Sequence, residues 1–286
     1  MERYYQIAGI DVCIKGKDEE LYQDDYRLAS FRSDKFSPEY SYEYSIAEKL
    51  DESSGDCIFC GPARKVFQDG KINIHYIGSV KNQLDHAYVR TEFNGTNVRV
   101  QVKSSSLQNH ITSKMVLNSL NIEGLLLKKD IFLLHASFIE VNGQAVLFTA
   151  PSGTGKSTQA ELWKQYRDAD IINGDRVAIR VEGNALTACG IPFAGSSKYC
   201  KNALLPIAAV VYLAQGTETK IMPFKGMQAF KKILNEVTIP VWEAYAVERV
   251  SDMLLTLIKN VPVYHLSCTP DESAVIALEN VLNREV

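Results

Sequence analysis

The stretch Ala150-Pro-Ser-Gly-Thr-Gly-Lys-Ser157 constrains the fold of this chain more than any other feature. It follows the pattern of a phosphate-binding loop, with Ala150 in place of the first glycine. The apolar residues 145–149 before it predict a strand, and residues 158–166 after it predict a helix. Because such a loop works between a strand and a helix, we predict an α/β unit around it.

The residue types of the loop predict nucleotide binding. Gly153 and Gly155 allow the backbone to curl and point its N–H groups at a phosphate, and the following helix adds the positive end of its dipole. Lys156 can reach the β- and γ-phosphates, and the hydroxyl of Ser157 can bind magnesium. The predicted nucleotide-binding residues are Ser152, Gly153, Thr154, Gly155, Lys156, Ser157 and Thr158. The alternative is a glycine-rich turn that matches by chance, and the flanking strand and helix argue against it.

A magnesium-binding carboxylate is expected at the end of a neighbouring strand. Asp175 fits this position, because it follows the apolar residues Ile171 and Ile172 and the small Gly174. We therefore predict that Ser157 and Asp175 hold Mg²⁺ and that the nucleotide is ATP. The alternative is that Asp175 is an ordinary turn residue.

Together these residues resemble the catalytic domain of the HPr kinase/phosphorylase family, which shares its loop with ATP-dependent phosphoenolpyruvate carboxykinase. The resemblance covers about residues 130–285. It rests on the loop, the pair Leu134-His135 before it, Asp175 after the next strand, and the spacing from Lys156 to Asp175. It implies that Asp175 binds magnesium and positions or deprotonates the acceptor hydroxyl, and that His135 lies at the phosphates. Taken alone, a histidine in an apolar strand is more often a buried core residue.

The sequence departs from that family at two points. Where the family has two adjacent aspartates, this chain has Gly174-Asp175-Arg176, so one carboxylate remains. The family's basic signature after the substrate loop is not evident, and Lys198, Lys201 and Arg249 are the candidates for it. Both departures count against the reverse, phosphorylase reaction and against HPr as the substrate.

The layout resembles more closely the HPr-kinase-like enzymes that phosphorylate a precursor peptide. The resemblance implies an ATP-dependent kinase that transfers the γ-phosphate to a hydroxyl, such as that of serine, of a peptide or protein. Asp175, His135 and Lys156 would then be the catalytic residues. Two alternatives stay open: a small-molecule kinase, and a nucleotide-binding regulatory module without catalysis, which the missing second carboxylate favours.

Residues 1–120 differ in pattern from the rest of the chain. Short alternating runs, with Asp69-Gly70 and Asn94-Gly95 between them, predict a β-rich N-terminal region for acceptor or dimer contacts, and hence a candidate homo-oligomer. The expected strands are 5–14, 71–77, 87–93 and 96–102. Residues 34–60 are expected to be loop with a short helix, and residues 107–129 to be helical.

Residues 121–286 are predicted to form an HPr-kinase-like α/β domain that binds ATP. The expected fold is therefore a β-rich N-terminal region plus a P-loop α/β domain. Its expected strands are 131–141, 144–149, 170–172, 177–181, 206–214 and 261–266. Its expected helices are 158–167, 225–236, 245–259 and 271–284.

The bulk composition narrows the class of partner. A net charge of −3 with no basic stripe predicts that nucleic acid is not a partner. Neither a signal segment at the N-terminus nor an apolar run of about 18 residues occurs, so we expect no membrane association and a cytoplasmic location. The six cysteines include one close pair, Cys57 and Cys60, and we expect reduced thiols rather than a zinc site.

Overall fold

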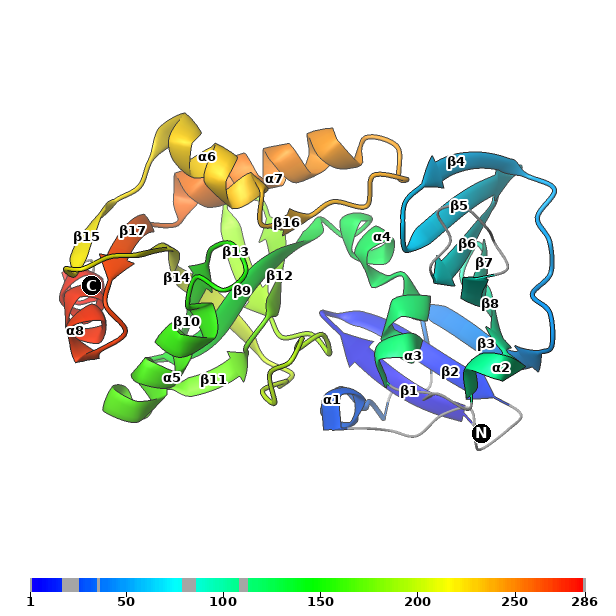
Figure 1. Ribbon diagram of the computed structural model, residues 1–286, viewed down its shortest axis with the longest axis horizontal. Coiled ribbons are helices and arrows are strands. Elements are labelled where there is room, and N and C mark those ends of the chain that lie inside the picture. Colours follow the sequence, from blue (N-terminus) through cyan, green and yellow to red (C-terminus); the bar gives the residue numbers. More distant parts are fainter. Residues whose placement is uncertain (1, 17–25, 35–36, 79–85, 108–112, 285–286) are drawn as a thin grey trace. The chain divides into compact units, whose positions relative to one another are not determined.

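The computed structural model describes residues 2–16, 26–34, 37–78, 86–107 and 113–284, and it shows a mixed α/β chain that is rich in sheet (Figure 1). The chain divides into two compact units. The first comprises Met1–Ile122 together with Val241–Ala244, and the second comprises Glu123–Pro240 and Tyr245–Val286. The short segment Val241–Ala244 is a part of the first unit that the sequence pattern did not predict.

The first unit is built on one eight-stranded sheet with the order β1-β2-β3-β8-β7-β6-β5-β4. Strand β3 pairs in parallel with β2 and β8, and the other neighbours are antiparallel. The strands are β1 (Glu2–Ile7), β2 (Ile10–Gly16), β3 (Tyr40–Ala47), β4 (Asp56–Cys60), β5 (Arg64–Asp69), β6 (Ile72–Gly78), β7 (Ala87–Asn94) and β8 (Asn97–Lys103). The helices are α1 (Tyr26–Ala29), α2 (Ser104–Leu107) and α3 (Ser113–Leu120), and α4 (Ile122–Leu127) begins at the boundary of the unit.

Both hairpin turns expected in this unit are confirmed. Asp69-Gly70 lies between the antiparallel strands β5 and β6, and Asn94-Gly95 lies between β7 and β8. Gly70 and Gly95 have φ values of 59° and 62°, a left-handed conformation that glycine adopts without steric cost. The turn chemistry alone is therefore sufficient to locate these two hairpins.

Two expectations for this part of the chain are wrong. Residues 5–14 are not one strand, because the chain turns at Ala8 and Gly9, and the left-handed φ of 48° at Ala8 has no signal in the sequence. Residues 34–60 were expected to be loop with a short helix, but the described part of this range, 37–60, contains strands β3 and β4, and long-range pairing with β2 and β8 stabilises β3. The helical expectation for residues 107–129 is confirmed over α3 and α4, which are separated at Asn121, and its residues 108–112 lie outside the described residues.

The tyrosine-rich stretch of β3 is a packing strip. Tyr40, Tyr42 and Tyr44 alternate with more exposed residues and are all buried. The hydroxyl of Tyr42 donates a hydrogen bond to the carbonyl oxygen of Leu120 at 2.7 Å, and the hydroxyls of Tyr44 and Ser119 are 2.6 Å apart. A direct contact between these side chains and a peptide is therefore not expected.

The second unit contains a nine-stranded sheet with a closed set of pairings. Its order is β10-β9-β12-β13-β14-β17-β15, and β10 also pairs with β14, so β9, β12, β13, β14 and β10 form a ring of neighbours. The strands are β9 (Ile131–Val141), β10 (Gln144–Thr149), β11 (Asp170–Asn173), β12 (Arg176–Glu182), β13 (Ala185–Cys189), β14 (Leu204–Gln215), β15 (Lys220–Pro223), β16 (Val237–Thr238) and β17 (Val263–Cys268). The helices are α5 (Lys156–Arg167), α6 (Gly226–Leu234), α7 (Ala246–Asn260) and α8 (Glu272–Leu282).

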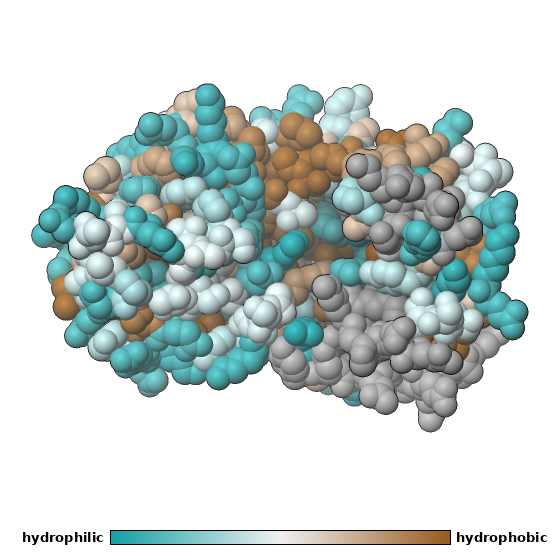
Figure 2. Space-filling view, in the orientation of Figure 1, coloured by the Kyte–Doolittle hydropathy of each residue, from teal (hydrophilic) through white to brown (hydrophobic). Residues whose placement is uncertain are grey.

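Helices cover both faces of this sheet (Figure 1). Successive residues of a strand point to opposite faces, and here the residues on both faces are apolar, so each face needs a cover. Along β10, Val146 and Phe148 pack against α5 and α8, where Trp163 is fully buried. Ala145 and Leu147 belong to the core on the other face, beneath α6 and α7. Figure 2 shows that the visible face of the second unit is largely hydrophilic, as expected when its apolar side chains are used inside.

The expected strands and helices of the second unit are confirmed with small shifts of their ends, including the hairpin turn Asn142-Gly143 between β9 and β10. Strands β13, β15 and β16 are additions that the sequence pattern did not predict. None of the helices that the structure describes is long and apolar enough to cross a membrane.

Candidate active site

The loop at 150–155 joins β10 to α5 and lies open to solvent. Gly153 and Gly155 have φ values of 80° and 117°. A Cβ added to either glycine would meet no atom within 4 Å, so the backbone conformation, rather than crowding, requires glycine there. Ser152, Ser157 and Thr158 are exposed at the N-terminal end of α5. The loop and the helix N-terminus therefore present backbone N–H groups to an anion from solvent.

Lys156 is the first residue of α5 and is largely buried. Its Nζ atom donates hydrogen bonds to the carbonyl oxygens of Ala150 at 2.8 Å and Pro151 at 3.3 Å. Burial lowers the pKa of Lys156, and the negative charges of Glu236 and Asp175 raise this pKa in part. The lysine is thus held against its own loop, where a bound phosphate would lie.

Strand β9 changes partners on both of its edges at His135. One edge pairs with β10 from Ala136 onward and with β16 at Leu134 and Leu133. The other edge pairs with β12 up to His135 and then with β11. The backbone N–H of His135 donates to the carbonyl oxygen of Glu236 at 2.9 Å, and that of Ala136 donates to the carbonyl oxygen of Asp175 at 3.0 Å. Segments that are distant in the sequence therefore meet at this point of β9.

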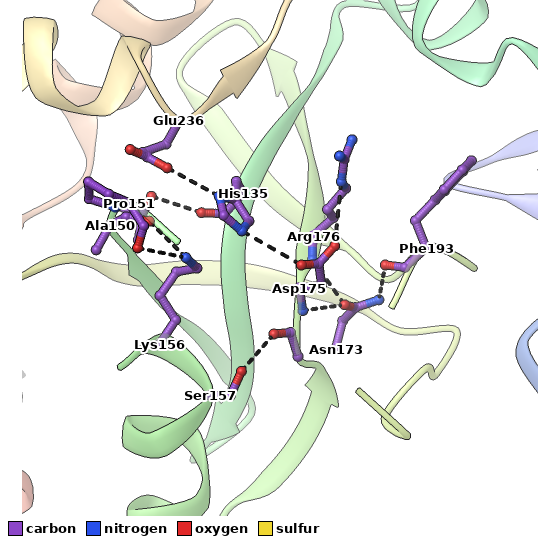
Figure 3. A network of polar contacts seen from close by, with 12 residues as sticks. His135, Ala150, Pro151, Lys156, Ser157, Asn173, Asp175, Arg176, Phe193 and Glu236 are labelled. Atoms are coloured by element: carbon purple, nitrogen blue, oxygen red, sulfur yellow. Dashed lines mark hydrogen bonds and ion pairs between the residues drawn. The ribbon is translucent and has the colours of Figure 1, made fainter. Parts of the chain in front are cut away.

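The imidazole of His135 lies between two carboxylates (Figure 3). Its Nδ1 atom is 3.1 Å from Oε2 of Glu236, and its Nε2 atom is 3.6 Å from Oδ1 of Asp175. Glu236 is 9 % exposed, whereas the side chain of Asp175 is 30 % exposed. The structure thus brings two of the predicted catalytic residues, His135 and Asp175, into contact and adds a buried carboxylate beside them.

A buried asparagine fixes the turn that carries Asp175. The side-chain oxygen of Asn173 accepts hydrogen bonds from the backbone N–H groups of Asp175 at 2.9 Å and Arg176 at 3.0 Å. Its amide nitrogen donates to the carbonyl oxygens of Ile191 at 2.9 Å and Phe193 at 3.1 Å. Because all four hydrogen-bonding positions of the amide are used, Asn173 ties this turn to the segment that follows β13.

The same segment approaches the carboxylate of Asp175 closely. Gly195 has a φ of 54°, and a Cβ added to it would lie 2.7 Å from Cγ of Asp175. Gly174, next to Asp175, is packed in the same way against the side chain of Ser197. Small residues are therefore required on both sides of this contact.

A cavity of about 350 Å³ opens beside the first turns of α5. Ser157 and Asp175 both line it, together with the segment Ser196-Ser197-Lys198-Tyr199. A magnesium ion that accompanies a nucleotide takes one or two protein oxygen ligands and completes its shell with phosphates and water. The hydroxyl of Ser157 and the carboxylate of Asp175 fit this donor set. Within the described residues, no group of three His, Cys, Asp or Glu side chains could hold a metal ion by itself, and the six cysteines, all of them described, form no disulfide.

The three basic candidates are placed differently. Lys201 pairs with Asp170, and Arg249 pairs with Asp130 at 2.8 Å, so both have partners away from the cavity. Lys198 lines the cavity, and its Nζ atom lies 5.3 Å from the ring centroid of Tyr199. Of these three residues, Lys198 is the one that lines the cavity.

Sequence reasoning missed Glu236, Asn173 and Gly195. Glu236 follows α6 in a stretch with no recognisable pattern, and pairing of the next residues with β9 brings it to His135. Asn173 ends the short strand β11 and looks like an ordinary turn former. The small residues of Gly190-Ile-Pro-Phe-Ala-Gly195 were the available signal for a close backbone approach.

A family model described as SynChlorMet cassette protein ScmC matches residues 100–282, which is more than half of the 286 residues. The chain belongs to the ScmC family. The matched range contains His135, the loop 150–155, Asp175 and Glu236. No curated protein matches this ScmC family member.

Among solved structures, this ScmC family member is similar to the Hpr(Ser) kinase/phosphatase from Coxiella burnetii. The two chains are 16 % identical with a TM-score of 0.33, and the alignment covers 54 % of this chain and 89 % of the other. A TM-score of this size does not establish a common fold, so the chemistry of the site rests on the residues of this chain. The family model places the chain in the ScmC family. The resemblance to HPr kinase/phosphorylase rests on the motif residues alone.

Proposed function

We propose that this chain binds ATP with magnesium at the loop 150–155 and transfers the γ-phosphate to a hydroxyl of a peptide or protein. One observation carries the proposal: Ser157 and Asp175 line a single cavity at the N-terminus of α5, and His135 contacts Asp175 from the adjacent strand. Phosphoryl transfer needs positioning and charge stabilisation more than covalent chemistry, and these residues supply both.

Each residue has a role in this proposal. The backbone N–H groups of Gly153 and Gly155 and the N-terminus of α5 would bind the β-phosphate, and Lys156 would bridge to the γ-phosphate. Ser157 and Asp175 would hold Mg²⁺, which supplies positive charge against the phosphate oxygens. His135 would face the acceptor side of the γ-phosphate.

The cavity supports an acceptor that presents a side chain. A volume of about 350 Å³ is at the lower end of ligand-sized pockets, which suits a single hydroxyl-bearing side chain of a longer molecule. We propose that the first unit, Met1–Ile122, serves recognition of the remainder of that acceptor, because each residue with a role in phosphate chemistry lies in the second unit.

Two measurements test the proposal. Titration calorimetry should show that the protein binds MgATP, and radiolabelled ATP should transfer phosphate to members of a pool of serine-containing peptides. With water as the only acceptor, we expect slow release of phosphate. Absence of MgATP binding would disprove the nucleotide site. Binding without transfer or hydrolysis would assign the chain to the regulatory modules instead.

A further inference from the structure

We propose that a groove between α6 and α7 docks an acidic amphipathic helix of a partner protein. The groove and the cavity beside α5 share no lining residue, so this docking does not depend on the proposed phosphotransfer. The chemistry of the partner follows from the apolar side chains that line the groove, from their exposure and from the sign of the charge beside them.

Two helices and the start of a strand line the groove, which has a volume of about 860 Å³. Met227 and Phe230, at i and i+3 on α6, contribute one side of the lining. Leu255 and Ile258, with the same spacing on α7, contribute another, and residues 261–264 complete the lining at the start of β17. Each helix thus presents a pair of apolar side chains to the same space.

The apolar lining is partly exposed to solvent. Met227 is 62 % exposed and Leu255 is 49 % exposed, although both are large apolar side chains. A small ligand is usually enclosed over most of its surface, and walls as open as these do not enclose one. Neighbouring exposed apolar side chains are typical of a surface that another protein covers, and methionine adapts well to such contacts.

The charged residues that line the groove are both lysines, Lys225 before α6 and Lys259 in the last turn of α7. Within the described residues neither of them forms an ion pair, whereas Lys220 on the neighbouring strand β15 is paired with Glu218 at 2.7 Å. The preceding acidic residue on α7, Asp252, lies seven residues before Lys259, which is about 10 Å along the helix.

The groove is therefore positive in a chain whose net charge is −3. The N-terminus of α6 has no side-chain cap, so the N–H groups of its first turn add partial positive charge at the same place. Carboxylates beside the apolar side chains of a partner would complement this charge, and lysines there would be repelled.

The edge of the sheet next to the groove favours a helix over an extended partner. Strand β15 stands at the end of the strand order, and its Lys220 and Pro223 are residues that disfavour the addition of another strand. The partner must then bind through side chains. A helix with apolar residues at i, i+3, i+4 and i+7 presents them in one stripe, which suits a groove lined by two helices.

Three labelled peptides test the proposal on wild-type protein. They share leucines at i, i+3, i+4 and i+7 and carry glutamate, glutamine or lysine at the positions between. Fluorescence anisotropy at low salt should show that the glutamate peptide binds at least about tenfold more tightly than the lysine peptide, with the glutamine peptide between them. Equal affinity for all three peptides, or no binding of the glutamate peptide, would overturn the proposal.

The double variant Lys225→Glu/Lys259→Glu should reverse this order of affinities, because it reverses the charge of the groove. The matched control is Lys128→Glu/Lys232→Glu, which changes the net charge equally at two exposed lysines of the same unit that do not line the groove. The control should keep the wild-type order, and circular dichroism checks both folds. The same order in the groove variant as in the control would overturn the proposal.

Methyl NMR of ¹³C-labelled methionines locates the bound peptide. The glutamate peptide should shift the signal of Met227, which Met227→Leu assigns, and leave that of Met253, which is buried on α7. Binding without a shift of Met227 would place the peptide elsewhere and overturn the proposal. A shift of Met227 with dodecanoate but not with the glutamate peptide would mean a small-ligand pocket. Light scattering that shows a dimer broken by Met227→Glu would mean that a second copy of the chain fills the groove, and either result would also overturn the proposal.

Discussion

The Nζ atom of Lys156 donates a hydrogen bond to the carbonyl oxygen of Ala150 at 2.8 Å, across the whole width of the loop (Figure 3). Nζ donates a second hydrogen bond to the carbonyl oxygen of Pro151, so backbone carbonyls of the loop accept from two of the three N–H groups of the ammonium. The same carbonyls keep the charged end of a largely buried side chain solvated. Lys156 is thereby held against the loop by the loop's own backbone carbonyls.

Replacing Lys156 by alanine should therefore weaken MgATP binding while the fold survives. A charge-assisted hydrogen bond contributes about 1.5–3 kcal/mol, so the dissociation constant should rise roughly 10- to 150-fold. Titration calorimetry measures the affinity, and Lys231→Ala on the exposed face of α6 is the control. An affinity equal to that of wild type in a folded Lys156→Ala protein would exclude this lysine from the nucleotide site.

Asp175→Asn should separate nucleotide binding from turnover. The amide keeps the size of the side chain but removes the negative charge that would hold Mg²⁺, so MgATP affinity should stay within about tenfold while turnover falls by orders of magnitude. The turn itself should persist, because Asn173 bonds to the backbone of Asp175 and not to its carboxylate. Full turnover of Asp175→Asn at saturating magnesium would show that Asp175 is a turn residue after all.

Gly195→Ala tests whether the close approach to Asp175 matters. The added methyl group would lie 2.7 Å from Cγ of Asp175, so either the carboxylate or the backbone must move. Gly183→Ala is a matched control, because Gly183 has a similar φ of 63° and its added Cβ would meet nothing within 4 Å. Both variants should lose about 1 kcal/mol of stability from backbone strain. Only Gly195→Ala should also lose turnover, by at least about tenfold, and equal turnover in the two variants would contradict this.

The first unit should lose stability as the pH falls, because it buries His75 completely. Burial, with a smaller contribution from the charge of Arg64, lowers the pKa of His75 well below its usual value of 6.5. The unfolded chain therefore binds a proton below about pH 6.5 that the folded unit excludes, so the free energy of unfolding decreases as the pH falls below 6.5 and is fully present above it. The slope can reach about 1.4 kcal/mol per pH unit.

Urea unfolding between pH 5 and pH 7.5 measures this slope, with Trp242 as a reporter because its ring lies 5.8 Å from that of His75. His75→Phe keeps an aromatic ring beside Phe93 and Trp242 but cannot titrate. Subtracting the pH slope of the free energy of unfolding of His75→Phe from that of wild type removes the contribution of the other titrating groups. The same slope in wild type and His75→Phe would show that His75 does not carry the effect.

Local signals were sufficient for most of the second unit. The turn Asn142-Gly143, the loop glycines and the helix that starts at Lys156 are each encoded within a few neighbouring residues. Local signals failed where long-range contacts decide the conformation. Strand β3 has a polar, tyrosine-rich sequence, and it is a strand because β2 and β8 flank it. Trp242, inside the second half of the sequence, belongs to the core around His75 and Phe59 in the first unit.

The sequence by itself determined the loop 150–155 and the strand and helix that flank it, because the signals for these elements reside in contiguous residues. The tertiary structure alone decided that Glu236 stands against His135, that Gly195 touches Asp175, and that His135 lies where β9 changes its partners. These contacts join segments up to 101 residues apart in the chain. Strand pairing and the packing of two cores on one sheet bring these residues together. Neither can be recognised from the sequence pattern next to Glu236.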